Sequence, residues 1–201
     1  MVLNSPADQI EAQEKQSELV FQIRELYGRV TYTHKVHEKC ADIYFRRSHT
    51  MKIVQIVLSA LTTGSLLLAI FGDGKIGTLI GAAFSTGLFG LNLYLKDFDF
   101  GELSQKHIAV AARLWNIREL YLSLITDLTT GKISSKKAME KRDSIQEQLS
   151  SIYLNSPRTI NQAYEQAQKA LKIEEEMTFS CEEIDRLLPE ALRLRTNVGS
   201  Q

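Results

Sequence analysis

The stretch that decides the fold runs from Ile53 to Leu95 and reads IVQIVLSALTTGSLLLAIF-GDGK-IGTLIGAAFSTGLFGLNLYL. Its two apolar segments, Ile53–Phe71 and Ile76–Leu95, contain 19 and 20 uncharged residues and flank the turn Gly72-Asp73-Gly74-Lys75. A helix of about 20 residues crosses the hydrocarbon core of a bilayer, so each segment suffices for one crossing. Because the turn is so short, the second helix must return antiparallel to the first. The stretch therefore predicts a transmembrane hairpin of two helices.

The charge of the chain lies almost entirely outside this hairpin. The 201 residues contain 24 Lys+Arg and 24 Asp+Glu, yet Asp73 and Lys75 carry the only charges between Ile53 and Leu95. The alternative is a buried hairpin in a soluble core, but such hairpins rarely keep two full membrane lengths free of charge. We therefore expect the lipid bilayer as partner. The net charge of zero gives no electrostatic case for nucleic acid.

The orientation follows from the basic residues beside the spans. Arg46, Arg47 and Lys52 precede the first span and Lys96 follows the second, while the turn carries one lysine. The positive-inside rule then predicts that both termini face the cytoplasm.

Both flanks predict helices. In residues 1–52 apolar side chains recur in steps of three and four, which predicts one amphipathic cytoplasmic helix that continues into the first span. Residues 96–190 predict further cytoplasmic helices that form a C-terminal bundle, and residues 191–201 a disordered tail. No segment alternates convincingly with a period of two. The fold class is therefore all-α, with a transmembrane hairpin continuous with long cytoplasmic helices.

The helices of the second flank have predicted stripes and caps. For the helix expected over residues 102–128, the apolar stripe is Leu103, Ile108, Ala111/Ala112, Trp115, Leu122 and Ile125. Ser134 or Ser135 is suited to cap the next helix. Ser156 and Pro157 are suited to the cap and first position of the one after it. Ser180 and Glu183 form the pattern of a capping box before a short last helix.

Polar side chains within the spans are candidate functional residues. Gln55, Ser59 and Thr62/Thr63 fall near one face of the first span, and Asn92 lies in the second. A lipid-facing amide is costly, so these groups should face protein or water. Two interpretations stay open: hydrogen bonding across the hairpin, or the lining of a pore formed by several subunits, since two helices alone enclose none.

The glycines of the second span are candidate packing residues. Gly77 and Gly81 are four apart, and Gly87 and Gly90 each follow a small residue by four positions. Small residues at this spacing let helix backbones approach closely in lipid. Packing within the hairpin and contact between subunits are both compatible with the pattern.

Signs of catalysis or metal binding are weak. His34, His37 and Cys40, with Glu38, do not have the spacing that brings ligands to one ion, so we expect no metal and no cofactor. With no catalytic constellation we expect no enzyme. Trp115, Arg118 and Tyr121 form a weak candidate ligand surface, with a core position as the alternative for Trp115.

The layout resembles the SLATT family, predicted two-transmembrane effectors of bacterial conflict systems. The residues that carry the resemblance, within roughly Leu19–Leu171, are YF (44–45), LWNIRELY (114–121), NSPRT (155–159) and AYEQA (163–167). The resemblance implies an anti-phage, abortive-infection effector in the bacterial inner membrane. Such a protein would act as a homo-oligomer that forms a pore or disrupts the membrane. The trigger would be a nucleotide second messenger, such as a cyclic nucleotide, bound directly or sensed by a partner protein. A membrane-tethered scaffold that recruits a partner without a pore is the alternative.

Overall fold

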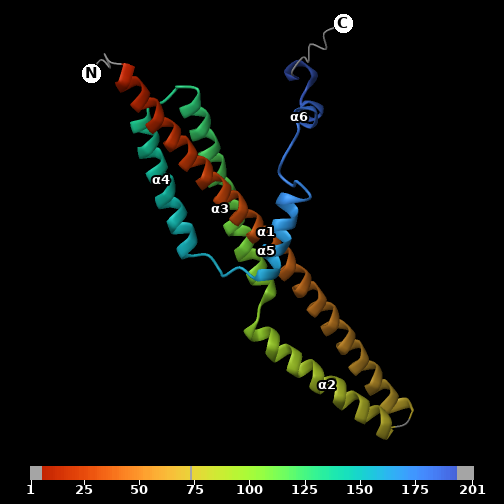
Figure 1. The fold of residues 1–201 in the computed structure, drawn as a ribbon. Helices are drawn as coiled ribbons and strands as arrows, with labels where there is room; N and C mark the ends of the chain where they lie inside the picture. Colours follow the sequence, from red (N-terminus) through yellow and green to blue (C-terminus); the bar gives the residue numbers. More distant parts are fainter. Residues whose placement is uncertain (1–5, 73, 194–201) are drawn as a thin grey trace.

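The computed structural model describes residues 6–72 and 74–193, and this part of the chain contains helices and no strand. The elements in chain order are α1 (Pro6–Phe71), α2 (Gly74–Asp97), α3 (Phe100–Thr129), α4 (Ser135–Leu154), α5 (Asn161–Lys172), α6 (Cys181–Leu187) and the 3-10 helix η1 (Glu190–Leu192). The prediction of an all-α fold with an apolar hairpin is confirmed (Figure 1). Residues 1–5 of the first predicted segment, Asp73 of the predicted turn and residues 194–201 of the predicted tail lie outside the described residues.

Helix α1 is one unbroken helix of 66 residues, about 100 Å long at 1.5 Å per residue. Beyond Pro6, where it begins, it contains no proline, and its glycines, Gly28 and Gly64, do not interrupt it. It therefore runs from the charged part of the molecule to the tip of the hairpin (Figure 1), as its periodicity predicts. Below, the hairpin means residues 53–95, and the body means the helical part formed by residues 11–52 and 100–172.

The body has two apolar clusters at different levels along α1. The larger one joins α1, α3 and α4 through Leu19, Ile23, Val30, Val110, Leu114, Ile117, Tyr121, Leu124, Leu128, Ala138, Ile145, Leu149 and Ile152. The smaller one joins α1 and α5 through Val36, Cys40, Ile43, Ala163 and Ala167. Short alanines on α5 allow that helix to lie close to α1, while the larger cluster excludes water from a three-helix contact.

The predicted apolar stripe of α3 is only partly correct: Ala111 is buried and Leu103 and Ile125 are partly buried, but the other predicted positions are displaced by about one residue. Ile108, Trp115 and Leu122 are exposed, and the buried line includes Ser104, His107, Leu114, Tyr121 and Leu128. The error has a physical cause, because two polar residues occupy buried positions and each makes a hydrogen bond to α1 there. Ser104 Oγ donates to the carbonyl of Ala41 at 2.9 Å, and His107 pairs with a histidine of α1.

The predicted helix start at Ser156 and Pro157 is also wrong. Residues 155–160 are not helical, and α5 begins at Asn161 without a side-chain cap. Ser156 Oγ donates instead to the carbonyl of Ile152 at 2.7 Å, at the end of α4. The other predicted caps are confirmed: Ser134 accepts from the amide of Lys137, and Ser180 and Glu183 form a complete capping box.

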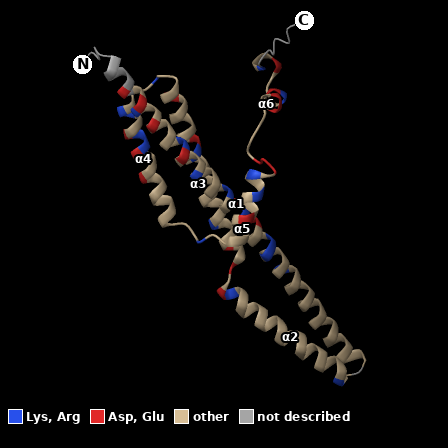
Figure 2. Cartoon of the chain, in the orientation of Figure 1, with Lys and Arg blue, Asp and Glu red and all other residues tan. Residues whose placement is uncertain are grey.

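The hairpin exposes nearly all of its apolar surface. Within residues 53–72 and 74–95 the only buried residues are Ser65, Gly77 and Gly81. In the most apolar 18-residue segments of the two helices, 6% and 11% of the residues are buried. The core of a soluble protein would bury such segments, so the exposure favours lipid as their surroundings. Figure 2 shows the same division in charge, with Lys, Arg, Asp and Glu concentrated on the body and sparse along the hairpin.

Candidate functional site

The two helices of the hairpin meet along a regular seam. On α1 the partly or fully buried positions are Met51, Gln55, Leu58, Thr62, Ser65 and Ala69, and on α2 they are Gly77, Gly81, Phe84, Leu88, Leu91 and Leu95. Both series advance by alternating steps of three and four, the spacing of a coiled-coil contact. The seam therefore holds α1 and α2 together with one face of each helix.

Close approach at the tip of the hairpin depends on two of the four candidate glycines. A Cβ atom on Gly77 would lie 2.4 Å from the backbone nitrogen of Ala69, and one on Gly81 would lie 2.8 Å from Ser65 Oγ. Gly87 and Gly90 have nothing within 4 Å of an added Cβ. The structure thus places Gly77 and Gly81 in the seam and leaves the surface at Gly87 and Gly90 open.

The candidate polar residues also differ in whether they contact the other helix of the hairpin. Gln55 Nε2 donates to Asn92 Oδ1 at 2.8 Å, so this pair crosses the hairpin. Thr62 is partly buried in the seam, and its hydroxyl donates to the carbonyl of Leu58 at 2.8 Å. Ser59 and Thr63 lie on the exposed surface, where Thr63 Oγ1 donates to the carbonyl of Ser59 at 3.0 Å. The hairpin of one chain therefore has a polar pair that links α1 to α2 at the edge of the seam, and an exposed hydroxyl pair on α1 alone.

The seam of α1 continues from the hairpin into the body. Towards its N-terminus the same series of steps passes through Ser48, Tyr44, Ala41 and His37, which are buried or partly buried where α1 meets α3. One face of one helix thus contacts α2 in the hairpin and α3 in the body. At the junction a cavity of about 180 Å³ lies between α1 and residues 95–100, lined by Ser48, Met51, Lys52, Gln55, Leu95, Phe98, Asp99 and Phe100.

Three buried histidines lie in the α1–α3 contact. His37 Nδ1 is 2.8 Å from His107 Nδ1, and His34 Nδ1 is 3.0 Å from the carbonyl oxygen of Ala111. Burial, with His107 and His34 nearby, lowers the pKa of His37 to about 4, and burial also lowers the pKa of His107. Both rings of the pair are therefore neutral at pH 7, with one Nδ1–H donating to the other nitrogen.

The partner of His37 is the functional candidate that sequence reasoning missed. His107 lies 70 residues from His37 along the chain, and only the matching seam positions of α1 and α3 signal the contact. Cys40 faces α5 instead, and burial raises the pKa of its thiol. Among the described residues no group of three or more His, Cys, Asp and Glu side chains is arranged to hold a metal ion.

The weak ligand surface on α3 is only partly assembled. The Trp115 ring is 45% exposed, and the Arg118 guanidinium lies 4.5 Å from its centroid. Arg118 Nε also donates to the hydroxyl of Tyr27 at 3.2 Å. Tyr121 is fully buried in the body, so it does not contribute to this surface.

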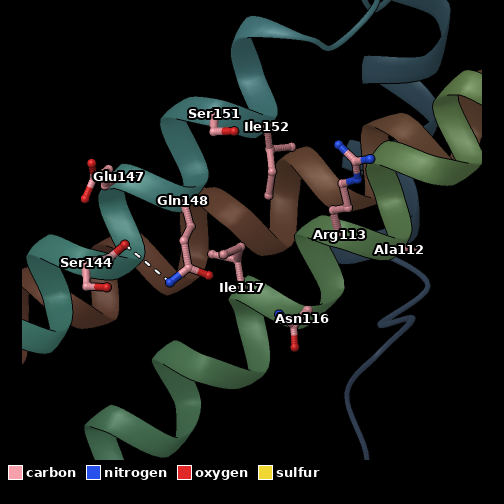
Figure 3. A pocket seen from close by; sticks show the side chains of 9 residues that line it. All are labelled: Ala112, Arg113, Asn116, Ile117, Ser144, Glu147, Gln148, Ser151 and Ile152. Atoms are coloured by element: carbon pink, nitrogen blue, oxygen red, sulfur yellow. Dashed lines mark hydrogen bonds between the residues drawn. The ribbon is translucent and has the colours of Figure 1, made fainter.

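A larger polar groove lies between α3 and α4. It has a volume of about 630 Å³ and is lined by Ala112, Arg113, Asn116, Ile117, Ser144, Glu147, Gln148, Ser151 and Ile152. Figure 3 shows Gln148 and Ile117 reaching towards each other between the two helices, with Gln148 Nε2 donating to the carbonyl of Ser144 at 3.4 Å. Arg113 and Asn116 provide cationic and amide groups at this groove. Sequence reasoning did not select them, because the polar positions of an amphipathic helix ordinarily face solvent.

Comparison with known families gives one match. The model described as "SMODS and SLOG-associating 2TM effector domain family 4" matches residues 19–183, which include most of the body, the hairpin and the start of α6. No curated protein and no solved structure matches the chain.

Proposed function

Since the chain belongs to the SMODS and SLOG-associating 2TM effector domain family 4, we propose that it is a pore-forming membrane effector of bacterial anti-phage defence. In this proposal several copies assemble in the inner membrane through their hairpins and open a pore or otherwise disrupt the bilayer. Both termini face the cytoplasm, in accord with Arg46, Arg47 and Lys52 ahead of the first span.

Assembly is supported by the difference between two pairs of glycines in α2. Gly77 and Gly81 are used within one hairpin, whereas Gly87 and Gly90 offer an open surface on α2. Open glycines let the backbone of another helix approach closely in lipid, where apolar surface alone gives little drive. Two helices in seam contact enclose no channel, so a pore requires several copies. The exposed hydroxyls of Ser59 and Thr63 are suited to face its water.

A route for the signal exists in the shared face of α1. Because α3 and α2 contact the same face of one rigid helix, a change in the α1–α3 contact alters the position of α1 relative to α2. A nucleotide second messenger is one trigger, and Arg113, Asn116 and Gln148 in the α3–α4 groove have the cationic and amide groups that a nucleotide uses. A sensor protein bound to the body is the other.

The assembly hypothesis is tested with glycine variants in cells. Expression is induced in the presence of a membrane-potential dye, and Gly87→Leu is compared with Gly87→Ala. Within one hairpin the space beside Gly87 is open. Alanine is still a small residue and should largely preserve depolarisation, whereas leucine should abolish it by blocking the close approach of a second helix. Both variants must reach the membrane in equal amounts. Equal depolarisation by the two variants would contradict assembly through this surface.

Thiol accessibility separates a pore from a scaffold. In a Cys181→Ser background, Ser59→Cys should react with a membrane-impermeant thiol reagent only when the dye reports depolarisation. Val57→Cys, at an exposed apolar position of the same helix, is the matched control and should stay unreactive. Growth and potential unaffected by every trigger, with Ser59→Cys never labelled, would favour the membrane-tethered scaffold.

A further inference from the structure

Helix α6 is fully formed, but the rest of the chain buries none of its apolar side chains. None of its residues is buried, although Ser180 and Glu183 make both bonds of a capping box. Figure 1 shows α6 standing away from the body, at the end of the molecule opposite to the hairpin. Phe179, Ile184, Leu187 and Leu192 are exposed, with Leu187 at 77%. A helix of seven residues is marginal in water alone, so this apolar surface indicates a binding partner.

The charge of the segment around α6 restricts that partner. Residues 179–192 contain four acidic residues, Glu182, Glu183, Asp185 and Glu190, and one basic residue, Arg186. A segment of this charge is repelled by an anionic membrane surface, and it lies far from the hairpin (Figure 1). Its partner should therefore be a protein surface with an apolar floor and a basic border.

The body of the same chain carries a surface of this kind, between α1 and α4. The groove has a volume of about 610 Å³ and is lined by Lys15, Glu18, Leu19, Gln22, Ser135, Met139 and Arg142. Its apolar part includes Met139, whose side chain is 41% exposed. Residues 132–142 around it contain five basic residues and one acidic residue, Glu140 (Figure 2). The groove itself contains Lys15, Glu18 and Arg142, of which Lys15 pairs with Glu11 and Arg142 with Asp143. The excess of positive charge lies at its border in residues 132–142, and it is this border that is complementary to the acidic α6 segment.

The other grooves near this end of the body fit less well. The groove beside Phe21 has one charged lining residue, Arg24, and the groove beside Leu154 has none. Within one chain the body separates the two elements, since α4 and α6 lie on different sides of α1 and α3 (Figure 1). An α6 segment from a neighbouring molecule meets no such barrier.

We propose that the α6 segment, residues 179–192, docks in the α1–α4 groove of a second copy of this chain. The apolar contact is made by Ile184 and Leu187 against Met139 and Leu19, and Lys15 and Lys136 lie opposite the acidic residues of α6. This contact joins the bodies of two molecules far from the hairpin. It does not rest on the proposed pore and would serve a scaffold equally.

Cross-linking of the full chain in membranes tests the proposal. Cys181, at the start of α6, is exposed, and Cys40 is buried, so Cys181 provides a native reactive thiol. Protein carrying Met139→Cys and Cys181→Ser under one epitope tag is mixed with protein carrying only Cys181 under a second tag. A short bis-maleimide should then give a product that contains both tags.

The matched control is Phe21→Cys in place of Met139→Cys. Phe21 is on α1 near the same end of the body and is 72% exposed, but it borders a different groove. Its cross-linked fraction should be at least about fivefold lower, with labelling by a monofunctional maleimide showing that both cysteines react. Equal cross-linking at the two positions, or no two-tag product, would overturn the proposal.

A charge exchange tests the complementarity separately. Lys15→Glu with Lys136→Glu should lower the two-tag product about threefold, the effect of a few exposed ion pairs. Adding Glu182→Lys and Glu190→Lys to the α6 donor should restore it. These changes leave Arg142, which is bonded to Gln22 and Asp143, and the capping residue Glu183 in place. The assigned orientation would be contradicted if the lysine-to-glutamate changes left the amount of two-tag product unaffected and the glutamate-to-lysine changes did not raise it.

Discussion

His37 and His107 face each other across the α1–α3 contact, with their Nδ1 atoms 2.8 Å apart. Two like nitrogens at this distance form one hydrogen bond only when one ring donates and the other accepts. The ring of Tyr44 lies over His107 with a centroid separation of 5.5 Å, and His107 Nε2 has no hydrogen-bond partner. A proton added to the accepting ring would remove the acceptor of this bond, and a proton added to either ring would place a charge in a buried contact.

Acid should therefore weaken the body. The pKa of His37 is about 4 in the folded chain, because burial disfavours its charged form, against an ordinary value of 6.5. Between these values the unfolded chain binds more protons, so stability is fully present above pH 6.5 and is lost as the pH falls towards 4. The loss expected from His37 is about 2 kcal/mol at pH 5 and about 3 kcal/mol near pH 4. Thermal unfolding in detergent, followed by circular dichroism at pH 7.5, 6.0 and 5.0, measures it.

The control for this prediction is His37→Phe, which keeps an aromatic ring but cannot be protonated. We expect a lower melting temperature than wild type at pH 7.5, because His107 loses its partner, and a flatter dependence on pH. A melting temperature of the wild type that is the same at pH 7.5 and 5.0 would show that the pair does not titrate in this way.

Alanine at the glycines should separate hairpin packing from the open surface. Gly77→Ala forces a methyl group to within 2.4 Å of the Ala69 backbone, so the helices must move apart, at a cost of about 1–3 kcal/mol. Gly87→Ala meets open space and should be close to neutral. Unfolding of the two variants in mixed micelles, with increasing SDS, compares them. Equal destabilisation by both would place the close contact elsewhere.

The bond between Gln55 and Asn92 should be measurable as a coupling. Gln55→Leu, Asn92→Leu and the double variant form a cycle, and a coupling of about 0.6–1.7 kcal/mol is expected for an interhelical hydrogen bond in lipid. SDS-induced unfolding provides the free energies. Additive single effects would mean that the two amides do not interact in the membrane.

The sequence was sufficient for the fold class because its strongest signals are local. Two apolar runs beside a glycine turn, and the steps of three and four from Leu19 to Tyr44, depend on neighbouring residues alone. The stripe of α3 failed where long-range contacts decide burial. Ser104 and His107 are polar by type and buried by virtue of partners on α1, at Ala41 and His37.

The candidate site shows the same limit. Gly77 and Gly87 are equivalent by residue type and by spacing to a small neighbour, so no local rule separates them. Only the course of α1 decides that Gly77 approaches Ala69 while Gly87 remains open. Gln55 and Ser59, four residues apart, likewise differ because the seam follows 55, 58 and 62 and leaves 59 outside.

The strained turn after α5 should depend on one ion-pair cluster. Glu175 and Met177 have φ values of 51° and 73°, in the left-handed region that side chains disfavour. Between them Glu176 contacts Lys35 and lies 3.1 Å from Lys39 Nζ on α1, and the hydrogen bonds from Lys35 and then Lys39 lower its pKa from 4.5. Because the carboxylate is partly exposed, Glu176→Gln should cost less than about 1 kcal/mol of overall stability.

The larger effect of Glu176→Gln should be local, because the turn leads directly to α6. Without the two lysine contacts the left-handed residues relax, and cleavage within residues 173–180 by a protease of low specificity should become faster. For the wild type, cleavage should also become faster as the pH falls through the lowered pKa of Glu176. The ion pairs stabilise the turn fully above pH 4.5, the ordinary pKa of a glutamate, and this stabilisation is lost as Glu176 is protonated below it. Glu175→Gln, on the exposed side of the same turn, is the control. Equal cleavage rates for Glu176→Gln and wild type at neutral pH would show that the turn is held by other contacts.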